Sequence, residues 1–132
     1  MQAIVEQATA VARTPIGAIS IIDRDRQWIA ARVGIDAVET LRSESICTKT
    51  ILRPGEPLII YDTTRDERSA SLPMITNAPY VRFYAGIPLV NRSGYPLGAL
   101  CVVDVTPREV APNISELGRL ARQVERILNG SV

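Results

Sequence analysis

The chain has 132 residues, of which 46% are hydrophobic and 22% charged, and its formal net charge is +1. This length and balance are typical of one globular domain, and they argue against disorder, a nucleic-acid groove, an anionic membrane surface or a membrane span. Histidine is absent, which excludes histidine-based triads, histidine-ligated zinc or haem, and a histidine proton switch.

The first half of the chain predicts a helix, a hairpin and a second helix. Apolar residues recur at helical spacing over 2–13, and Pro15 ends that helix. Residues 16–23 are apolar on both faces, as in a strand that is covered on both sides, and a polar turn joins them to a strand over 27–33. After an irregular stretch, 43–52 predicts a helix with one apolar face.

The second half predicts three further strands. A short strand over 58–61 is followed by a polar stretch with short helical pieces around 64–67 and 71–76. Residues 81–90 and 95–104 form the clearest hairpin of the chain, because a polar turn with a glycine joins two apolar runs of similar length.

An amphipathic helix over 113–128 closes the chain. Asn113 can cap it, Glu116 is placed to complete a capping box, and Asn129-Gly130 end it. The order of elements predicts an α/β fold of the α+β type, with a mainly antiparallel sheet of five to six strands and helices over both faces. Without linkers or repeats, we expect a single domain over residues 1–132.

Several segments together resemble the GAF domain, a small-molecule sensor module. The best segments are RFYAGIPL at 82–89, LGALCVVD at 97–104 and the pair Pro107-Arg108. The resemblance is closest to the bacterial type found beside histidine kinases and diguanylate cyclases. It implies that the first and last helices cover one face of the sheet, and that short helices and a ligand pocket lie on the other. Because the chain starts and stops in predicted helices, we expect it to be a piece of a longer signalling protein, such as one of a two-component system, and without an apparent signal peptide we expect it in the cytoplasm.

The departures from the GAF pattern bear on cofactors. Bilin-binding members attach the pigment through a Cys-His pair, and this sequence has no histidine. Cyclic-nucleotide members carry an Asn-Lys-Phe-Asp-Glu pattern that is also missing, and Ile29, Ile46 and Ser69 stand where members often have an aromatic residue. We therefore expect no bilin, haem or cyclic nucleotide, and any ligand would be another small molecule.

One face of the strand over 81–90 carries Arg82 and Tyr84, where a purely hydrophobic layer would be simpler to build. An arginine near a tyrosine can hold an anionic or planar ligand by bidentate hydrogen bonds and stacking, which predicts a pocket here. The predicted ligand-binding residues are Arg82, Tyr84, Ile46, Cys47, Thr50, Asp62, Asp66, Trp28 and Tyr80. The alternative is that Arg82 pairs with Asp62 or Asp66 and that side chains fill the space.

No catalytic motif accompanies this pocket. The sequence has no P-loop, dinucleotide fingerprint, metal-site spacing or nucleophile elbow, and its acidic pairs in turns are interpreted as caps and ion pairs. Cys47 and Cys101 lie in apolar stretches, which predicts buried free thiols with a raised pKa. A thiol-dependent enzyme is an alternative, because some GAF-like proteins reduce methionine sulfoxide.

The terminal helices predict a second functional surface. Family members commonly dimerise through these helices, and the last helix often continues into an output domain. The residues predicted at a homodimer interface are Ile4, Val11, Leu117, Leu120, Val124 and Ile127. We expect a non-catalytic regulatory domain that binds a small ligand and signals to a fused output domain, such as a histidine kinase or diguanylate cyclase. The alternative is a dimerisation module without a ligand.

Overall fold

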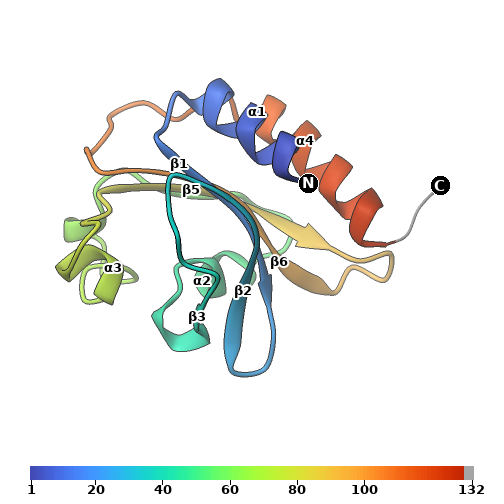
Figure 1. The fold of residues 1–132 in the computed structure, drawn as a ribbon, viewed down its shortest axis with the longest axis horizontal. Helices are drawn as coiled ribbons and strands as arrows, with labels where there is room; N and C mark the ends of the chain where they lie inside the picture. The colour runs from blue at the N-terminus through green and yellow to red at the C-terminus, as the bar shows by residue number, and fades with distance from the viewer. Residues whose placement is uncertain (130–132) are drawn as a thin grey trace.

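Six antiparallel strands form one sheet in the order β3-β2-β1-β6-β5-β4 (Figure 1). The structure, a computed structural model, describes residues 1–129. The strands are β1 (Ile16–Ile22), β2 (Arg26–Val33), β3 (Glu39–Leu41), β4 (Leu58–Ile60), β5 (Phe83–Val90) and β6 (Pro96–Asp104). The predicted mainly antiparallel α+β fold is confirmed. No helix within the described range is both long and apolar enough to cross a membrane.

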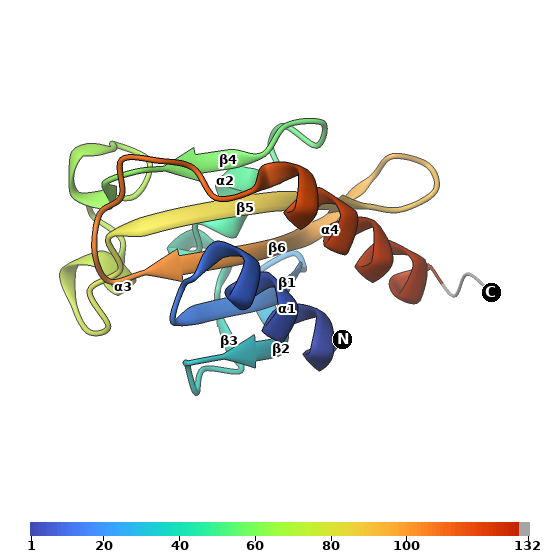
Figure 2. The ribbon, with the colours of Figure 1, turned by 90° about the horizontal axis from the view of Figure 1, so that it is seen from above.

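Helices α1 (Gln2–Ala12) and α4 (Ile114–Leu128) lie side by side over one face of the sheet (Figure 2). Their apolar stripes pack on β5 and the central strands, where Phe83 and Leu100 meet Val5 and Leu120 in one buried cluster. This layer is a close-packed core, as the helical spacing of the apolar residues predicts.

The same packing corrects the predicted dimer interface. Ile4, Leu117, Leu120 and Val124 are buried against the sheet of their own chain, so they have no surface to offer a partner. A helix that covers a sheet uses its whole apolar stripe for that purpose. Of the six residues, only Val11 is half-buried, and only Ile127, with 51% of its surface exposed, faces solvent.

Arg108 fixes the end of α1. Arg13 adopts a left-handed conformation with φ 56°, which leaves the last carbonyls of the helix without helical partners. Arg108 donates to the carbonyl oxygens of Ala12 at 2.7 Å and Arg13 at 2.5 Å, and it pairs with Asp104 at 2.6 Å. The start of the chain is therefore tied to the segment that leads into α4.

The cap of α4 is only partly as predicted. The Asn113 side chain accepts a hydrogen bond from the Glu116 backbone N–H at 3.0 Å, which confirms the cap. The Glu116 carboxylate pairs with Arg119 on the same helix face instead of reaching back to complete a capping box. The predicted stop at Gly130 lies outside the described residues.

Short elements cover the other face of the sheet: η1 (Arg42–Glu44), α2 (Cys47–Thr50), η2 (Thr63–Arg65) and α3 (Pro73–Thr76). The predicted continuous helix over 43–52 is wrong, because Ser45 has an extended backbone between η1 and α2. The Ser45 hydroxyl accepts the Cys47 N–H at 3.1 Å, so its side chain competes with helical backbone bonds. The irregular stretch before it contains β3, which pairs with β2.

The strand β5 begins two residues later than predicted, and this changes where its first side chains point. Tyr80 has φ 58°, and the Val81 N–H donates to the Met74 carbonyl at 2.9 Å rather than to a neighbouring strand. Val81 consequently packs with the second core cluster, on the face opposite Phe83, and Arg82 precedes the regular alternation of the strand.

Candidate functional site

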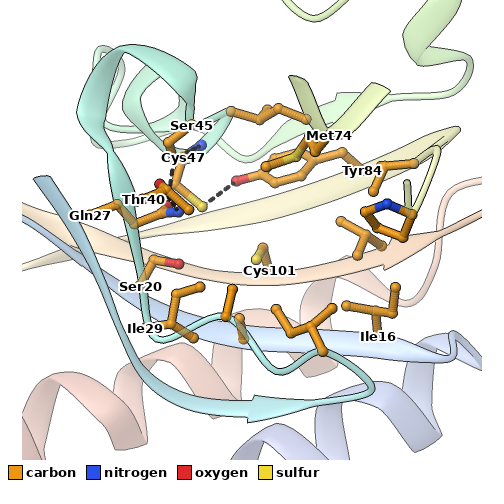
Figure 3. Close-up of a pocket in the computed structure, with 17 residues that line it drawn as sticks. Ile16, Ser20, Gln27, Ile29, Thr40, Ser45, Cys47, Met74, Tyr84 and Cys101 are labelled. Atoms are coloured by element: carbon orange, nitrogen blue, oxygen red, sulfur yellow. Dashed lines mark hydrogen bonds between the residues drawn. The ribbon is translucent and has the colours of Figure 1, made fainter. Parts of the chain in front are cut away.

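A cavity of about 170 Å³ lies between the sheet and the layer of short helices (Figure 3). Its apolar wall consists of Ile16, Ala18, Ile29, Ile35, Ala37, Ile46, Met74, Pro79, Val81 and Val103. Its other lining residues are Ser20, Gln27, Thr40, Ser45, Cys47, Tyr84 and Cys101. Strands β1, β2, β5 and β6 supply the floor, and α2, α3 and the segment before β3 supply the walls.

A hydrogen-bonded chain of side chains forms one end of the cavity. The Ser45 hydroxyl donates to the side-chain oxygen of Gln27, Oε1, at 2.5 Å, and the side-chain nitrogen of Gln27, Nε2, donates to Thr40 Oγ1 at 3.1 Å. Thr40 in turn donates to the Leu41 carbonyl at 3.2 Å. Gln27 and Ser45 are buried, and these bonds offset the cost of removing their polar groups from water.

Tyr84 connects the floor of the cavity to α2. Its hydroxyl donates to the Cys47 sulfur at 3.1 Å and lies 2.8 Å from Thr50 Oγ1, which therefore acts as the donor. Gly86, two residues along the same face of β5, leaves room for the ring, because a Cβ there would lie 2.7 Å from Tyr84 Cζ. The glycine thus permits the tyrosine to lie along the sheet and to reach α2.

The two cysteines are buried free thiols, as predicted, but their pKa values diverge. Hydrogen bonds from Cys101 and then Tyr84 lower the pKa of the Cys47 thiol to about 7, although burial acts in the opposite direction. The expectation of a raised pKa is therefore wrong for Cys47. The hydrogen bond with Cys47, together with burial, raises the pKa of Cys101, and burial raises the pKa of Tyr84, which keeps it a neutral donor.

Arg82 does not share the cavity with Tyr84. Its guanidinium donates to the carbonyls of Ile75 at 3.0 Å and Val81 at 3.1 Å and lies 5.9 Å from the centre of the Tyr80 ring. Because β5 starts only at Phe83, the assumed alternation of Arg82 and Tyr84 on one face does not hold. The expectation that these two side chains together hold an anionic or planar ligand in one pocket is corrected accordingly.

Four other predicted residues also lie away from the cavity. Asp62 caps η2 by accepting the Thr64 N–H at 3.0 Å, and Asp66 pairs with Arg68 at 2.6 Å, so neither pairs with Arg82. Hydrogen bonds from Thr64 lower the pKa of Asp62, and those from Arg68 lower the pKa of Asp66. Both carboxylates therefore serve as caps and ion pairs.

The two predicted aromatic residues face solvent. Trp28 is 44% exposed and lies on the opposite face of β2 from the cavity residues Gln27 and Ile29, because successive side chains of a strand alternate. Tyr80 is 52% exposed and stacks with Arg82 at the surface. Of the predicted ligand-binding residues, Ile46, Cys47 and Tyr84 line the cavity, and Thr50 is buried directly behind Tyr84.

The sequence analysis missed the polar residues Ser20, Gln27, Thr40 and Ser45. Ser20 is the one polar residue of an otherwise apolar strand, 16–22, and a polar residue at a buried position is the informative signal. Gln27 and Thr40 come together only through the pairing of β2 with β3, which the sequence did not indicate. Within residues 1–129 no cluster of three acidic or cysteine side chains is placed to hold a metal ion.

Comparison with known proteins gives one curated relative and many similar structures. The chain is 43% identical over 105 residues to a cyclic di-GMP phosphodiesterase from Pseudomonas aeruginosa, a match that covers 80% of this chain and 18% of that protein. The chain thus spans less than a fifth of the relative's length.

Two solved structures show the same fold at low identity. The GAF domain of an Acinetobacter phosphoenolpyruvate-protein phosphotransferase is 17% identical, with a TM-score of 0.69 over 98% of this chain and 77% of the other. The free methionine-R-sulfoxide reductase of Neisseria meningitidis is 15% identical, with a TM-score of 0.74 over 95% of this chain and 73% of the other.

The family assignment rests on nearly the whole chain. The model of the GAF domain matches residues 1–128, which include every strand of the sheet and both terminal helices. The arrangement that the resemblance implied, with the terminal helices on one face and the cavity with its short helices on the other, is the one observed. The chain belongs to the GAF domain family.

Proposed function

We propose that this chain is a regulatory sensor domain, in which a small ligand occupies the cavity and changes the position of α4. GAF domains are generally sensory ligand-binding modules. The observation that carries the proposal is the cavity itself: a space of about 170 Å³ inside a buried layer, with hydrogen-bonding groups at one end. Protein interiors rarely leave such a volume empty, since voids reduce stability.

The strand β5 provides the physical route from the cavity to α4. Tyr84 faces the cavity, whereas Phe83 and Leu89 on the same strand pack beneath α4. Beyond this packing, the Glu125 carboxylate accepts the Val90 N–H at 2.7 Å, and Arg122 donates to the Pro88 carbonyl at 2.9 Å. A ligand that prefers one position of β5 would therefore bias the position of the helix.

The output would be carried by another part of a longer protein. The relative is named as a cyclic di-GMP phosphodiesterase, and 82% of its length lies outside the match with this chain. We propose that the chain regulates such a fused activity, or that of a histidine kinase or diguanylate cyclase, in the cytoplasm. A homodimer would use the exposed part of the terminal helices around Val11 and Ile127. Sedimentation as a monomer at high concentration would contradict the dimer.

A thiol-dependent enzyme is the second candidate, favoured by the lowered pKa of Cys47 and its hydrogen bond with Cys101. One similar structure is a free methionine-R-sulfoxide reductase. Free methionine sulfoxide is a zwitterion, however, and the cavity lining drawn from residues 1–129 includes no charged side chain to bind its ammonium or carboxylate. Turnover of methionine sulfoxide with dithiothreitol would establish this candidate.

The sensor proposal is tested by blocking the cavity in the full-length protein. Ala37 is exposed and lines the cavity, so Ala37→Trp places an indole at its edge, whereas Val38→Trp changes the next, exposed residue outside the lining. The rate of the output reaction is measured with and without a deproteinised cell extract. We expect the extract to change the rate of the wild type and of Val38→Trp but not of Ala37→Trp. An extract that changes all three rates equally, or none, would refute the proposal.

A further inference from the structure

The lining of the cavity selects among ligand classes. Resting on the proposed function, we infer that the ligand is a small, uncharged, largely apolar molecule, about the size of a substituted benzene ring, with one hydrogen-bonding group. Three observations lead to this inference: the volume of the cavity, the charge of its lining, and the position of its free polar groups.

The volume sets the size. Pockets for drug-sized ligands measure roughly 300–1,000 Å³, whereas an apolar cavity of roughly 150 Å³ binds benzene. At about 170 Å³, this cavity matches the second case. A dinucleotide or a tetrapyrrole is several times larger and would require the layer of short helices to move away from the sheet.

The lining excludes anions. Within the described part of the chain, all seventeen lining residues are uncharged types, and the one arginine predicted to enter, Arg82, bonds to backbone carbonyls outside. An anionic ligand would lose its hydration without gaining a partner of opposite charge. Any ionisation of Cys47, whose pKa is about 7, adds negative charge and so opposes an anion further.

The polar groups still available lie at one end. Tyr84, Thr40 and Ser45 already use their hydroxyl protons within the protein. Gln27 spends one amide proton on Thr40, which leaves its second proton for a ligand. The buried hydroxyl of Ser20 lies beside Cys47 on the same side and donates its proton toward that sulfur, so its oxygen is left to accept a hydrogen bond from a ligand (Figure 3).

The other end of the cavity is apolar. Figure 3 shows Ile16 and Met74 away from the polar group, and Val81, whose N–H donates to the Met74 carbonyl, lies beside Met74. A ligand that fits both ends has one hydroxyl, carbonyl or amide group directed toward Ser20 and Gln27 and an apolar body against the opposite wall. Phenols, aromatic amides and short neutral aliphatic compounds have this form.

Access is at the surface between two segments. The exposed lining residues are Ala37, before β3, and Pro79, after α3, and their half-buried neighbours Ile35 and Met74 stand beside them. Neither segment belongs to a strand of the sheet, so a side chain here can move without breaking strand pairing. A blocking residue can therefore be introduced at this opening without altering the floor.

Benzamide and benzoate provide the test, because they share a shape and differ in charge. Binding to the chain is measured at pH 7.5 by calorimetry and by the shift of Tm, with p-cresol and cyclic di-GMP as further probes. We expect saturable binding of benzamide and p-cresol, with a rise in Tm of several degrees at 100-fold the Kd. We expect no binding of benzoate or cyclic di-GMP.

Variants locate the binding. Ala37→Trp should weaken the binding of benzamide at least tenfold, whereas Val38→Trp should not. If Ala37→Trp lowers the stability of the domain by itself, Met74→Trp serves as a second variant that blocks the opening from the other side. Ser20→Ala should weaken the binding of p-cresol about fivefold, because one hydrogen bond is lost, and should leave the binding of toluene, which has no hydroxyl group, unchanged. Benzamide binding that survives both blocking variants would place it elsewhere and overturn the inference.

The outcomes separate the ligand class from the sensor function. Binding of benzoate or cyclic di-GMP that Ala37→Trp abolishes would overturn the ligand class and leave the sensor function intact. Failure of both neutral probes to bind the wild type would also overturn the class. An extract that leaves the output rate of the full-length protein unchanged would instead refute the sensor function, whatever the probes do.

Discussion

Replacing Tyr84 by phenylalanine removes the hydroxyl that joins β5 to α2. The ring and its packing against Gly86 stay, but Cys47 loses a donor at 3.1 Å and Thr50 loses its acceptor at 2.8 Å. Because Thr50 is buried, its hydroxyl must find another partner, and the carbonyl of Cys47 three residues earlier, which accepts the Ile51 N–H, has a second lone pair for that. The net cost of two such bonds is then about 1–2 kcal/mol.

This cost can be measured as a change in Tm. With an unfolding entropy of about 2.1 cal/mol/K per residue, a domain of this length loses roughly 4 °C per kcal/mol, so we expect Tm to fall by roughly 4–8 °C. Tyr95→Phe is the matched control, because Tyr95 is 67% exposed and its hydroxyl is free to bond with water. Its expected effect is within about 0.5 kcal/mol.

A double-mutant cycle separates the hydrogen bond from the packing. Thr50→Val removes the other partner, and the two changes together should cost about 1 kcal/mol less than the sum of the single changes. Urea unfolding at constant slope gives the free energies. A Tyr84→Phe variant as stable as the wild type, with an additive cycle, would refute the assignment of this bond as a link between strand and helix.

Three further predictions test the site and the core. Gly86→Ala crowds the neighbouring tyrosine ring and should lower the free energy of unfolding by about 1–3 kcal/mol. Gly118→Ala, at an open position in α4, should raise the free energy of unfolding by about 0.5–1 kcal/mol. Equal effects of Gly86→Ala and Gly118→Ala in urea unfolding would contradict the contact between Gly86 and the Tyr84 ring. The rate of alkylation of Cys47 by iodoacetamide should rise with pH through 7 and level off above about pH 8, since roughly half of a thiol with this pKa is ionised at pH 7, against about 3% for an ordinary one. A rate that keeps rising to pH 9 would show that the hydrogen bonds do not hold the thiolate. Leu120→Ala should lower the free energy of unfolding by about 2–5 kcal/mol, and Ile127→Ala by less than about 0.5 kcal/mol, as measured by thermal unfolding. The reverse order would indicate that Leu120 contacts a partner and not the core of its own chain.

The regular elements were predictable because their sequence periodicity and their burial agree. The strand over 16–22 and the hairpin of β5 and β6 are short apolar runs that are buried on both faces, and the closing helix repeats its apolar residues at helical spacing. The prediction failed where a side chain competes with the backbone for hydrogen bonds. Ser45 interrupts a helix by bonding to Gln27, eighteen residues earlier in the chain, and periodicity within a short window carries no trace of that bond.

The site was harder to predict for a related reason. Arg82 was assigned to the cavity by extending the alternation of β5 backward, yet the backbone turns at Tyr80, and the strand starts only at Phe83. One error of two residues therefore placed an arginine in the cavity and led to the expectation of an anionic or planar ligand. Tyr84 was assigned correctly to the face that carries the cavity because it lies within the regular strand.

The cavity itself follows from the sizes of side chains on the two faces of the sheet. Toward α1 and α4 the central strands present large residues, among them Ile19, Leu100 and Val102, which the long helices cover completely. Toward α2 and α3 the same strands present Ala18 and Ser20 of β1, Ala99 and Cys101 of β6, and Gly86 of β5. The four-residue helices α2 and α3 cannot fill the space that such small side chains leave. A cavity therefore remains between them and the sheet, and it contains the free polar groups of Ser20 and Gln27. Enlarging Ala18, which lines the cavity, should therefore stabilise the domain and abolish binding together, whereas Gly86 has no such room because the Tyr84 ring lies against it. This opposition is expected where a protein keeps an underpacked face for function.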